Sequence, residues 1–566
     1  MEDKDIEAVS KQNSSINQIA DDYLAKVIEL DPVMATYLGI EGHNDSFGNY
    51  APDGCQESND LVVETLGRIE ASVAADRAES IASTAMSERL ELEADRFAAG
   101  EWKRSLNVIA SPLQEIRQVF DLMPTGSDDH WHDISQRLSK VPAALAGYRE
   151  SLSVGLRESQ SASSRQALRC ADQAFAYART TGSPGFFTSL AAKYHSTSSS
   201  LATELIENAQ SAALAYQEFG EYLNDDYAPK TQASDFIGAD RWQLMCRTFN
   251  GTEVDAAETY AWGWEEMARI ENEMTLCARE IDPSKSLEEV LGDLDGIKGY
   301  VIEGEDNFRA WNQELLDSTM DALTGSHFDV PEPVRRIEAM IAPPGGAAAM
   351  YYTPPTVDFS RPGRTWYPTM GRTKFPLWTE VSTAYHEGVP GHHMQVAQIY
   401  YLGDRLNSFQ RLLGSISGYL EGWALYAERL MAELGFLDDP IYRLGMLAAQ
   451  ALRAARVVVD IGLHHQYAIP AQQRRLPAEI WAPELAVGLM HSLSGRELAF
   501  AQSEVDRYLG WPAQATSYKI GERIWLETRE AARAAQGANF SLKRFHQDGF
   551  NLGFVGLGQL REELGH

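Results

Sequence analysis

Cysteines are few in this sequence of 566 residues, and long apolar runs are missing. The four cysteines are scattered and form no CxxC pair, which argues against a disulfide framework and against a thiolate zinc site. No stretch approaches the ~18 uninterrupted apolar residues of a membrane span. The N-terminus is acidic and polar, without the basic start and apolar run of a secretion signal. We therefore expect a cytoplasmic protein without a membrane partner.

Basic residues are also scarce relative to acidic ones. The sequence holds 49 Lys and Arg against 81 Asp and Glu, and its formal net charge is -32. Because such a chain repels a phosphate backbone, we expect no nucleic-acid partner. The hydrophobic share of 44% and the charged share of 23% are ordinary for a globular protein.

Most of the sequence has the periodicity of amphipathic helices, and strand signals are rare. Residues 200–224 and 255–280 are long, alanine-rich and amphipathic, which predicts two extended helices. Residues 151–166 are rich in Ser and Gln and are expected to form a connection between helices or a mobile loop. The composition and spacing together predict a mainly α fold.

One region, residues 343–376, is too rich in Pro and Gly to remain helical. Two runs inside it, Ala347–Thr353 and Arg364–Thr369, carry aromatic and β-favouring residues, and we expect short strands there. An edge strand offers free N–H and C=O groups to which a peptide backbone can add. A surface loop is the alternative interpretation.

The next segment has the residue types of a metal site. His386 and Glu387 follow a predicted helix face, as in the HExxH pattern, where two His four residues apart bind zinc and the Glu activates water. Here the fourth position after His386 is Pro390, so a regular helix cannot supply the second ligand. A bulge at residues 389–391 would place His392 there, and we prefer His392 over the alternative His393.

The third ligand is expected from a helix near residues 419–430. Glu421 would complete a His2Glu set and leave one position open for water or a substrate carbonyl. Glu428 is expected to orient one of the histidines from behind. Ordinary packing of a kinked helix remains an alternative.

The segments HEGVPGHHMQ, EGWALYAERL and RAARVVVDIGLHH together resemble the bacterial DUF885 family, and the resemblance extends from about residue 31 to residue 553. That family is placed among the gluzincin-like metallopeptidases, so the resemblance implies the fold and the metal chemistry but no substrate. EGWALYAE is also similar to the segment that supplies the third zinc ligand in gluzincin aminopeptidases, which implies Glu421 rather than Glu428.

Two further places hold candidate catalytic residues. Arg456, Asp460 and His464 are spaced four residues apart on one helix, so Asp460 could pair with Arg456 and orient His464 toward an oxyanion, or the three could form a buried ion-pair network. Tyr518 is a second candidate oxyanion donor. Lys519, or Arg453 on the same helix as His464, could hold a substrate carboxylate.

The expected architecture is mainly α-helical, with a deep cleft and a short β-strand edge next to the metal. Residues 1–330 would form one helical wall and residues 331–566 the catalytic part, in one continuous structural unit. The cleft favours short peptides by analogy with related folds.

The predicted function is zinc-dependent hydrolysis of short peptides, with one Zn2+ per chain held by His386, His392 and Glu421. Glu387 would act as general base, and His464 or Tyr518 would stabilise the oxyanion. Two alternatives stay open. One is a metal-dependent amidase or esterase with a non-peptide substrate, and the other is a catalytically inactive helical binding protein.

Overall fold

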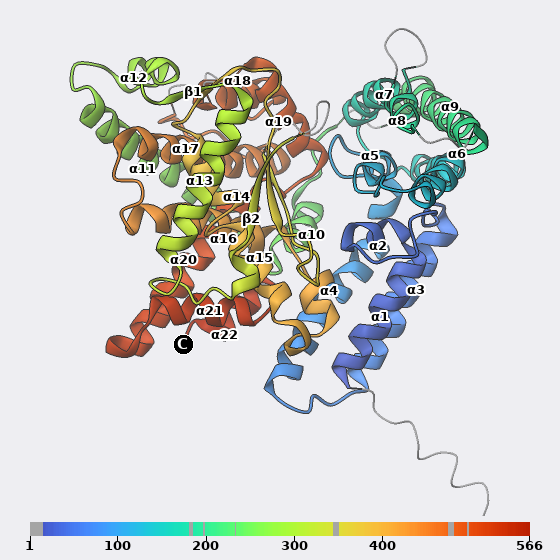
Figure 1. Cartoon of the computed structure of the whole chain (residues 1–566), viewed down its shortest axis with the longest axis horizontal. Helices are drawn as coiled ribbons and strands as arrows, with labels where there is room; N and C mark the ends of the chain where they lie inside the picture. Colours follow the sequence, from blue (N-terminus) through green and yellow to red (C-terminus); the bar gives the residue numbers. More distant parts are fainter. Residues whose placement is uncertain are drawn as a thin grey trace, which may run out of the picture. The chain divides into compact units, whose positions relative to one another are not determined.

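The computed structural model describes residues 15–179, 185–195, 199–231, 234–342, 350–473, 480–494 and 497–566. Within these ranges the chain is mainly helical, as predicted, and holds five short strands (Figure 1). None of the described helices is long and apolar enough to cross a membrane.

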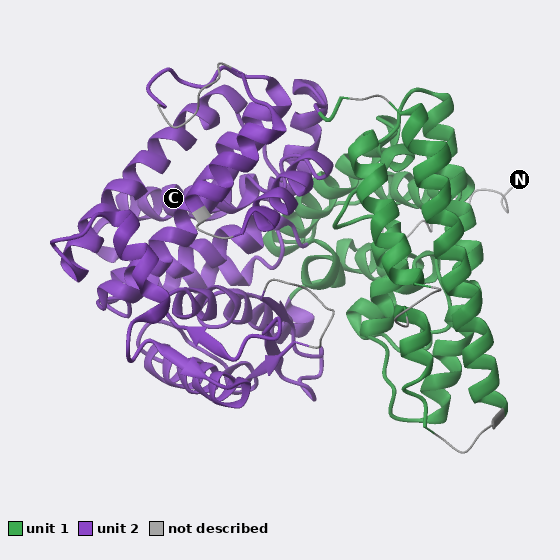
Figure 2. Cartoon of the chain, turned by 90° about the horizontal axis from the view of Figure 1, so that it is seen from above, with its two compact units in different colours: residues 1–235, 406–414 green, residues 236–405, 415–566 purple. Residues whose placement is uncertain are grey.

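Two compact units make up the chain (Figure 2). The first consists of residues 1–235 and 406–414, and the second of residues 236–405 and 415–566. The boundary therefore lies near residue 235, whereas the sequence suggested residue 330. The expected cleft stays a prediction.

The first unit is entirely helical within the described residues. Its helices are α1 (Ile16–Leu30), α2 (Pro32–Leu38), α3 (Pro52–Glu70), α4 (Arg77–Ala98), α5 (Pro112–Gln118), α6 (Asp128–Arg157), α7 (Ser164–Ala178), α8 (Phe186–Ala191) and α9 (Ser199–Glu221), with the short η1 (Glu101–Arg104), η2 (Val119–Asp121), η3 (Tyr222–Tyr227), η4 (Ala228–Lys230) and η8 (Phe409–Leu413).

Local signals explain where several of these helices begin and end. The Asp31 carboxylate accepts the backbone N–H groups of Val33 and Met34, so it caps α2 and separates this helix from α1. Helix α9 confirms the prediction for residues 200–224. The Ser-rich segment at residues 151–166 is only partly a connection, because α6 continues to Arg157 and α7 begins at Ser164.

The second unit combines helices with two small sheets. Its helices are α10 (Ala239–Asn250), α11 (Ala256–Ile281), α12 (Leu287–Asp293), α13 (Glu305–Leu323), α14 (Glu380–Glu387), α15 (His392–Tyr401), α16 (Ser417–Glu433), α17 (Pro440–His465), α18 (Pro483–Ser494), α19 (Leu498–Gly510), α20 (Ser517–Gln536), α21 (Leu542–Asn551) and α22 (Leu557–Leu564), with the short η5 (Leu294–Gly296), η6 (Glu332–Arg335), η7 (Gly403–Arg405) and η9 (Gly537–Asn539).

The sheets lie between α12 and α14 in the sequence. Strand β1 (Val301–Glu303) pairs antiparallel with β5 (Lys374–Pro376). The second sheet has the order β2-β4-β3 and contains β2 (Ile337–Ile341), β3 (Tyr351–Thr353) and β4 (Gly363–Tyr367). Strand β4 runs parallel to β2 and antiparallel to β3, so β3 lies at an edge.

The two predicted strands correspond to β3 and β4, although both are shorter than expected. Residues 343–349, which include the start of the first predicted run, lie outside the described residues. The sequence did not predict β2, because it precedes the Pro- and Gly-rich region and pairs with a partner 26 residues away.

Two glycines allow a close crossing of helices in the second unit. Helix α16 packs along α20, and a Cβ atom at Gly422 would lie 2.4 Å from the Cα of Gly521. The two backbones approach this closely because neither residue has a side chain. The crossing sets the position of Glu421, which directly precedes Gly422.

Candidate metal centre

A break between two helices replaces the regular HExxH geometry. Helix α14 ends at Glu387, and α15 begins at His392, so the expected bulge at residues 389–391 is a turn between separate helices. The turn folds back tightly on α14, because a Cβ atom at Gly391 would lie only 1.9 Å from the carbonyl oxygen of His386. Glycine is therefore required at this position.

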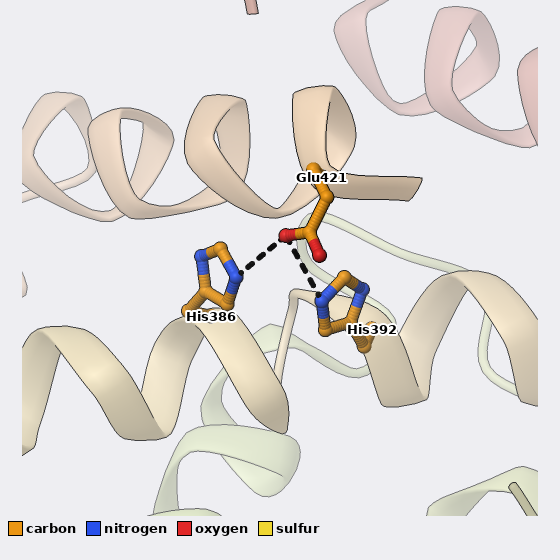
Figure 3. Close-up of side chains that lie close together, drawn as sticks. All are labelled: His386, His392 and Glu421. Atoms are coloured by element: carbon orange, nitrogen blue, oxygen red, sulfur yellow. Dashed lines mark hydrogen bonds and ion pairs between the residues drawn. The ribbon is translucent and has the colours of Figure 1, made fainter. Parts of the chain in front are cut away.

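The turn and α16 bring three donor side chains together (Figure 3). His386 Nε2 lies 3.1 Å from Glu421 Oε2, and His392 Nε2 lies 3.5 Å from the same oxygen. One donor atom from each of the three residues lies within 4.8 Å of the other two. All three side chains point toward one another across the space between α14, α15 and α16.

These separations fit a single zinc ion. Tetrahedral ligands with bonds of ~2.0–2.1 Å lie about 3.3 Å apart, close to the 3.1 Å and 3.5 Å that separate the two histidine nitrogens from Glu421 Oε2. The donor set of two imidazoles and one carboxylate is one that zinc accepts, although other divalent ions bind such sets too. The geometry is therefore compatible with a metal centre.

His393, the alternative second ligand, is directed elsewhere. Its Nε2–H donates to the carbonyl oxygen of Val334 at 2.7 Å, and its Nδ1 lies 3.0 Å from the hydroxyl of Tyr352, from which it accepts. Burial lowers the pKa of His393 to about 4, which keeps the ring neutral for these two bonds. Tyr352 lies on β3, so His393 ties α15 to the sheet.

Behind His386 lies a fully buried carboxylate, Glu428. His386 Nδ1 donates to Glu428 Oε1 at 2.8 Å, and the Ser382 hydroxyl donates to Oε2 at 2.5 Å. Arg453 Nη2 lies 3.5 Å from Oε1. Burial raises the pKa of Glu428, but Arg453 and these hydrogen bonds outweigh that effect and lower it overall. Glu428 therefore fixes the ring orientation of His386 and leaves Nε2 facing Glu421.

The carboxylates of Glu421 and Glu428 together favour a positive charge at His386. Burial lowers the pKa of His386, but its hydrogen bonds with Glu421 and Glu428 outweigh burial and raise the pKa to about 9. Without a metal, a proton occupies the position between His386 and Glu421. A metal ion binding there must displace that proton.

Removing the charge behind His386 is expected to weaken zinc binding. Glu428→Gln should lower the zinc affinity about 10–100-fold, the usual effect of losing a group that orients a ligand. Chelator competition measures this affinity. Glu433→Gln is the matched control, because Glu433 is the last residue of α16 and pairs with Arg529 at 2.9 Å. Equal affinities of the two variants would contradict the role assigned to Glu428.

Glu387 is half-buried and directly follows His386 on α14. Burial raises the pKa of Glu387, and neighbouring Glu421 adds to the rise, while His386 and His392 lower it. A carboxyl group whose pKa lies above its ordinary value exchanges protons more readily near neutral pH. This is the property that a general base and acid requires.

Tyr518, at the start of α20, lies beside His386. Its ring stacks on His386 with 6.5 Å between ring centroids, and the Arg456 guanidinium lies 4.8 Å from its centroid. Burial, followed by the charge of Glu421, raises the pKa of Tyr518 to about 12. The hydroxyl therefore keeps its proton at neutral pH and can donate a hydrogen bond.

The pairing predicted for α17 is wrong. Arg456 pairs with Glu504 at 2.8 Å, and Asp460 instead accepts a hydrogen bond from the indole N–H of Trp242 at 2.7 Å. Burial raises the pKa of Asp460 to about 7, an effect that a paired Arg456 would oppose. The structure therefore gives Arg456 and Asp460 other partners in place of each other.

His464 and Lys519 are both engaged within the protein. His464 Nε2–H donates to the carbonyl oxygen of Tyr508 at 3.1 Å. Lys519 is fully buried, with its ammonium 2.8 Å from Glu266 and in a second ion pair with Glu522. A substrate carboxylate at Lys519 is therefore not supported, and the oxyanion role of His464 stays a prediction.

Sequence reasoning missed Ser382 and the actual partner of Arg453. Ser382 lies four residues before His386 on α14, so the two share a helix face, and this spacing was an available signal. Arg453 was considered as a substrate anchor, but its charge lies against Glu428. No local pattern links α17 to Glu428, so this contact was not accessible from sequence.

Comparisons with other proteins cover nearly the whole chain. Residues 32–564 match the family model described as "Bacterial protein of unknown function (DUF885)". No curated protein matches the chain. A crystal structure from Colwellia psychrerythraea, described as a "putative lipoprotein", has a TM-score of 0.84 at 24% identity and covers 98% of this chain and 99% of its own.

A second solved structure, from Shewanella oneidensis and described as a "putative lipoprotein of unknown function", has a TM-score of 0.74 at 16% identity. It covers 97% of this chain and 99% of its own. At these identities the two structures show the fold alone. The family match spans almost all of the sequence, and the chain therefore belongs to the DUF885 family of bacterial proteins.

Proposed function

We propose that this protein is a zinc-dependent hydrolase that cleaves peptide bonds in short peptides. The observation that carries the proposal is the convergence of His386, His392 and Glu421 within 4.8 Å, with Glu387 next to the first of them. A pure binding site has no need of a carboxyl group with a raised pKa beside the donors. The same features support kinship with the gluzincin-like metallopeptidases.

Each residue has a separate task in the proposed reaction. When bound, a zinc ion supplies a Lewis acid that polarises a carbonyl and acidifies water. Glu387 takes the proton of the attacking water and later donates it to the leaving amine. Tyr518 donates its hydroxyl hydrogen to the oxygen on which negative charge develops. Glu428 holds the His386 ring through Nδ1.

The edge strand β3 supports a peptide as the substrate. Tyr352 on this strand contacts His393, the residue after the proposed ligand His392, so the strand is tied to the helix that carries the ligand. An extended peptide adds to an exposed strand edge through main-chain hydrogen bonds, whatever its side chains. A short peptide is therefore the substrate class that we propose.

The test compares substrate classes with and without metal. Chain freed of metal by chelation is expected to be inactive, and about one equivalent of zinc is expected to restore cleavage of peptides of about 2–10 residues. Mass spectrometry of a peptide panel, run beside a panel of non-peptide amides and esters, measures this. Turnover of the second panel alone would favour the amidase or esterase alternative. Zinc binding without any turnover would favour the binding protein.

We propose the cytoplasm as the location of the protein. The two solved relatives are described as lipoproteins, and covalent lipidation holds a protein at a membrane. Recovery of the native protein in the membrane fraction would therefore overturn the cytoplasmic location without affecting the proposed chemistry.

A further inference from the structure

The turn that carries His392 is held by an indole group from the opposite helix. Trp423 is fully buried on α16, two residues after Glu421. Its Nε1–H lies 2.9 Å from the carbonyl oxygen of Pro390 and 3.2 Å from that of Gly391. These are the two carbonyl groups that immediately precede His392.

We propose that Trp423 is a positioning residue that holds the turn at residues 388–391 so that His392 faces Glu421. This inference rests on the proposed metal centre. Helix α16 makes two contacts here. Glu421 lies against the donor nitrogens of the two histidines, and Trp423 bonds to the backbone of the turn between them. The second contact sets the separation of α15 from α14.

The indole cannot easily turn away from these carbonyl groups. Its rings pack into a cluster of other aromatic side chains, with centroid separations from 4.7 Å to 6.3 Å. The members of the cluster are Phe328, Tyr426, Trp525, His546 and Phe550. Since the ring plane is fixed on all these sides, the N–H direction is fixed as well.

The indole gives the turn a hydrogen-bond donor from outside its own segment. The backbone bonds of the turn include Gly391 N–H to the carbonyl of Tyr385 at 2.9 Å and His393 N–H to that of Gly388 at 3.1 Å. The Gly391 carbonyl also accepts the Gln395 N–H at 3.2 Å, so it shares its two donors between α15 and the indole. Both Pro390 and Gly391 are buried, so water cannot substitute freely for the indole at their carbonyl groups. Loss of the indole N–H should therefore loosen the turn and move His392.

Trp525 provides a matched control. It lies on α20, is fully buried and packs against Trp423 with 5.1 Å between ring centroids. Among the described residues, however, its Nε1 has no hydrogen-bond partner. Trp423→Phe and Trp525→Phe remove similar volume from one aromatic cluster, but only the first removes a bond to the turn.

The experiment measures turn protection and zinc affinity separately in the full chain. Hydrogen–deuterium exchange without metal should be faster at the Gly391 and His393 amides in Trp423→Phe than in Trp525→Phe. Competition with a chelator should show about 10–100-fold weaker zinc binding in Trp423→Phe alone. The visible spectrum of bound Co2+ should change in that variant, because it reports ligand geometry.

The outcomes separate this inference from the metal proposal. Equal exchange in the two variants would overturn the positioning role, whether or not zinc binds. Faster exchange in Trp423→Phe with no zinc binding by the natural chain would retain that role and reject the metal centre. If Trp423→Phe does not fold, replacement of Trp423 by 3-benzothienylalanine keeps the bicyclic shape without the N–H and permits the same comparison.

Discussion

Glu387→Gln is expected to keep bound zinc and lose about 10²–10⁴-fold in peptide turnover, the usual contribution of a general base. Gln has nearly the shape of Glu but cannot take a proton from water. Glu387 is not among the three donors that lie within 4.8 Å of one another, so the metal should remain. Initial rates on a cleaved peptide, together with the zinc content of each preparation, measure both effects.

Glu421→Gln gives the complementary result to Glu387→Gln. It removes a proposed ligand, so zinc and turnover should fall together. The pair therefore distinguishes proton transfer from metal binding within one site. A fully active Glu387→Gln variant would show that another group is the base and that the proposed mechanism is wrong.

His386→Ala is expected to reduce zinc from about one ion per chain to near zero, because two of three protein ligands bind too weakly. The matched control is His393→Gln, which changes a buried His seven residues later in the same segment. Both ring nitrogens of His393 are engaged with Val334 and Tyr352, so this variant should retain zinc. Elemental analysis of protein purified without a His tag or chelator measures the content.

Zinc affinity should also depend on pH. In the metal-free chain the pKa of His386 is raised to about 9, so zinc must displace a proton below that pH. The apparent affinity should therefore fall as the pH decreases from about 9. If the natural chain binds no zinc even after zinc is added back, the turn has destroyed the site and the binding protein becomes the preferred function.

Much of the fold was predictable because helical periodicity is a local property. The predicted helix at residues 255–280 corresponds to α11, which runs from Ala256 to Ile281, since alternating apolar and polar faces extend along the whole window. Helix starts are local as well. Asp255, for example, caps α11 by accepting two backbone N–H groups that lie within four residues of it in the sequence. The short strands were harder to predict, because β2 depends on pairing with β4 across 26 residues.

The site was predictable where its chemistry depends on the types of residues present and on their spacing in the sequence. His386, Glu387 and the choice of His392 over His393 came from spacing and from the breaks that Pro390 and Gly391 impose. The structure brings His386 and His392 together with Glu421, 35 residues away from the first. The predicted pairing of Arg456 with Asp460 was wrong. The sequence around a charged helix residue does not show which distant residue it will contact in the fold.

The sequence by itself determined where the helices run, which residue types could hold a metal and which glutamate lies beside the first histidine. These features depend on neighbours within a few residues of each other. The tertiary structure alone decided that Glu428 supports His386, that Trp423 reaches the turn before His392 and that Lys519 is neutralised by Glu266. Such choices depend on close helix crossings and on buried groups that must find partners, which arise only when distant segments pack together.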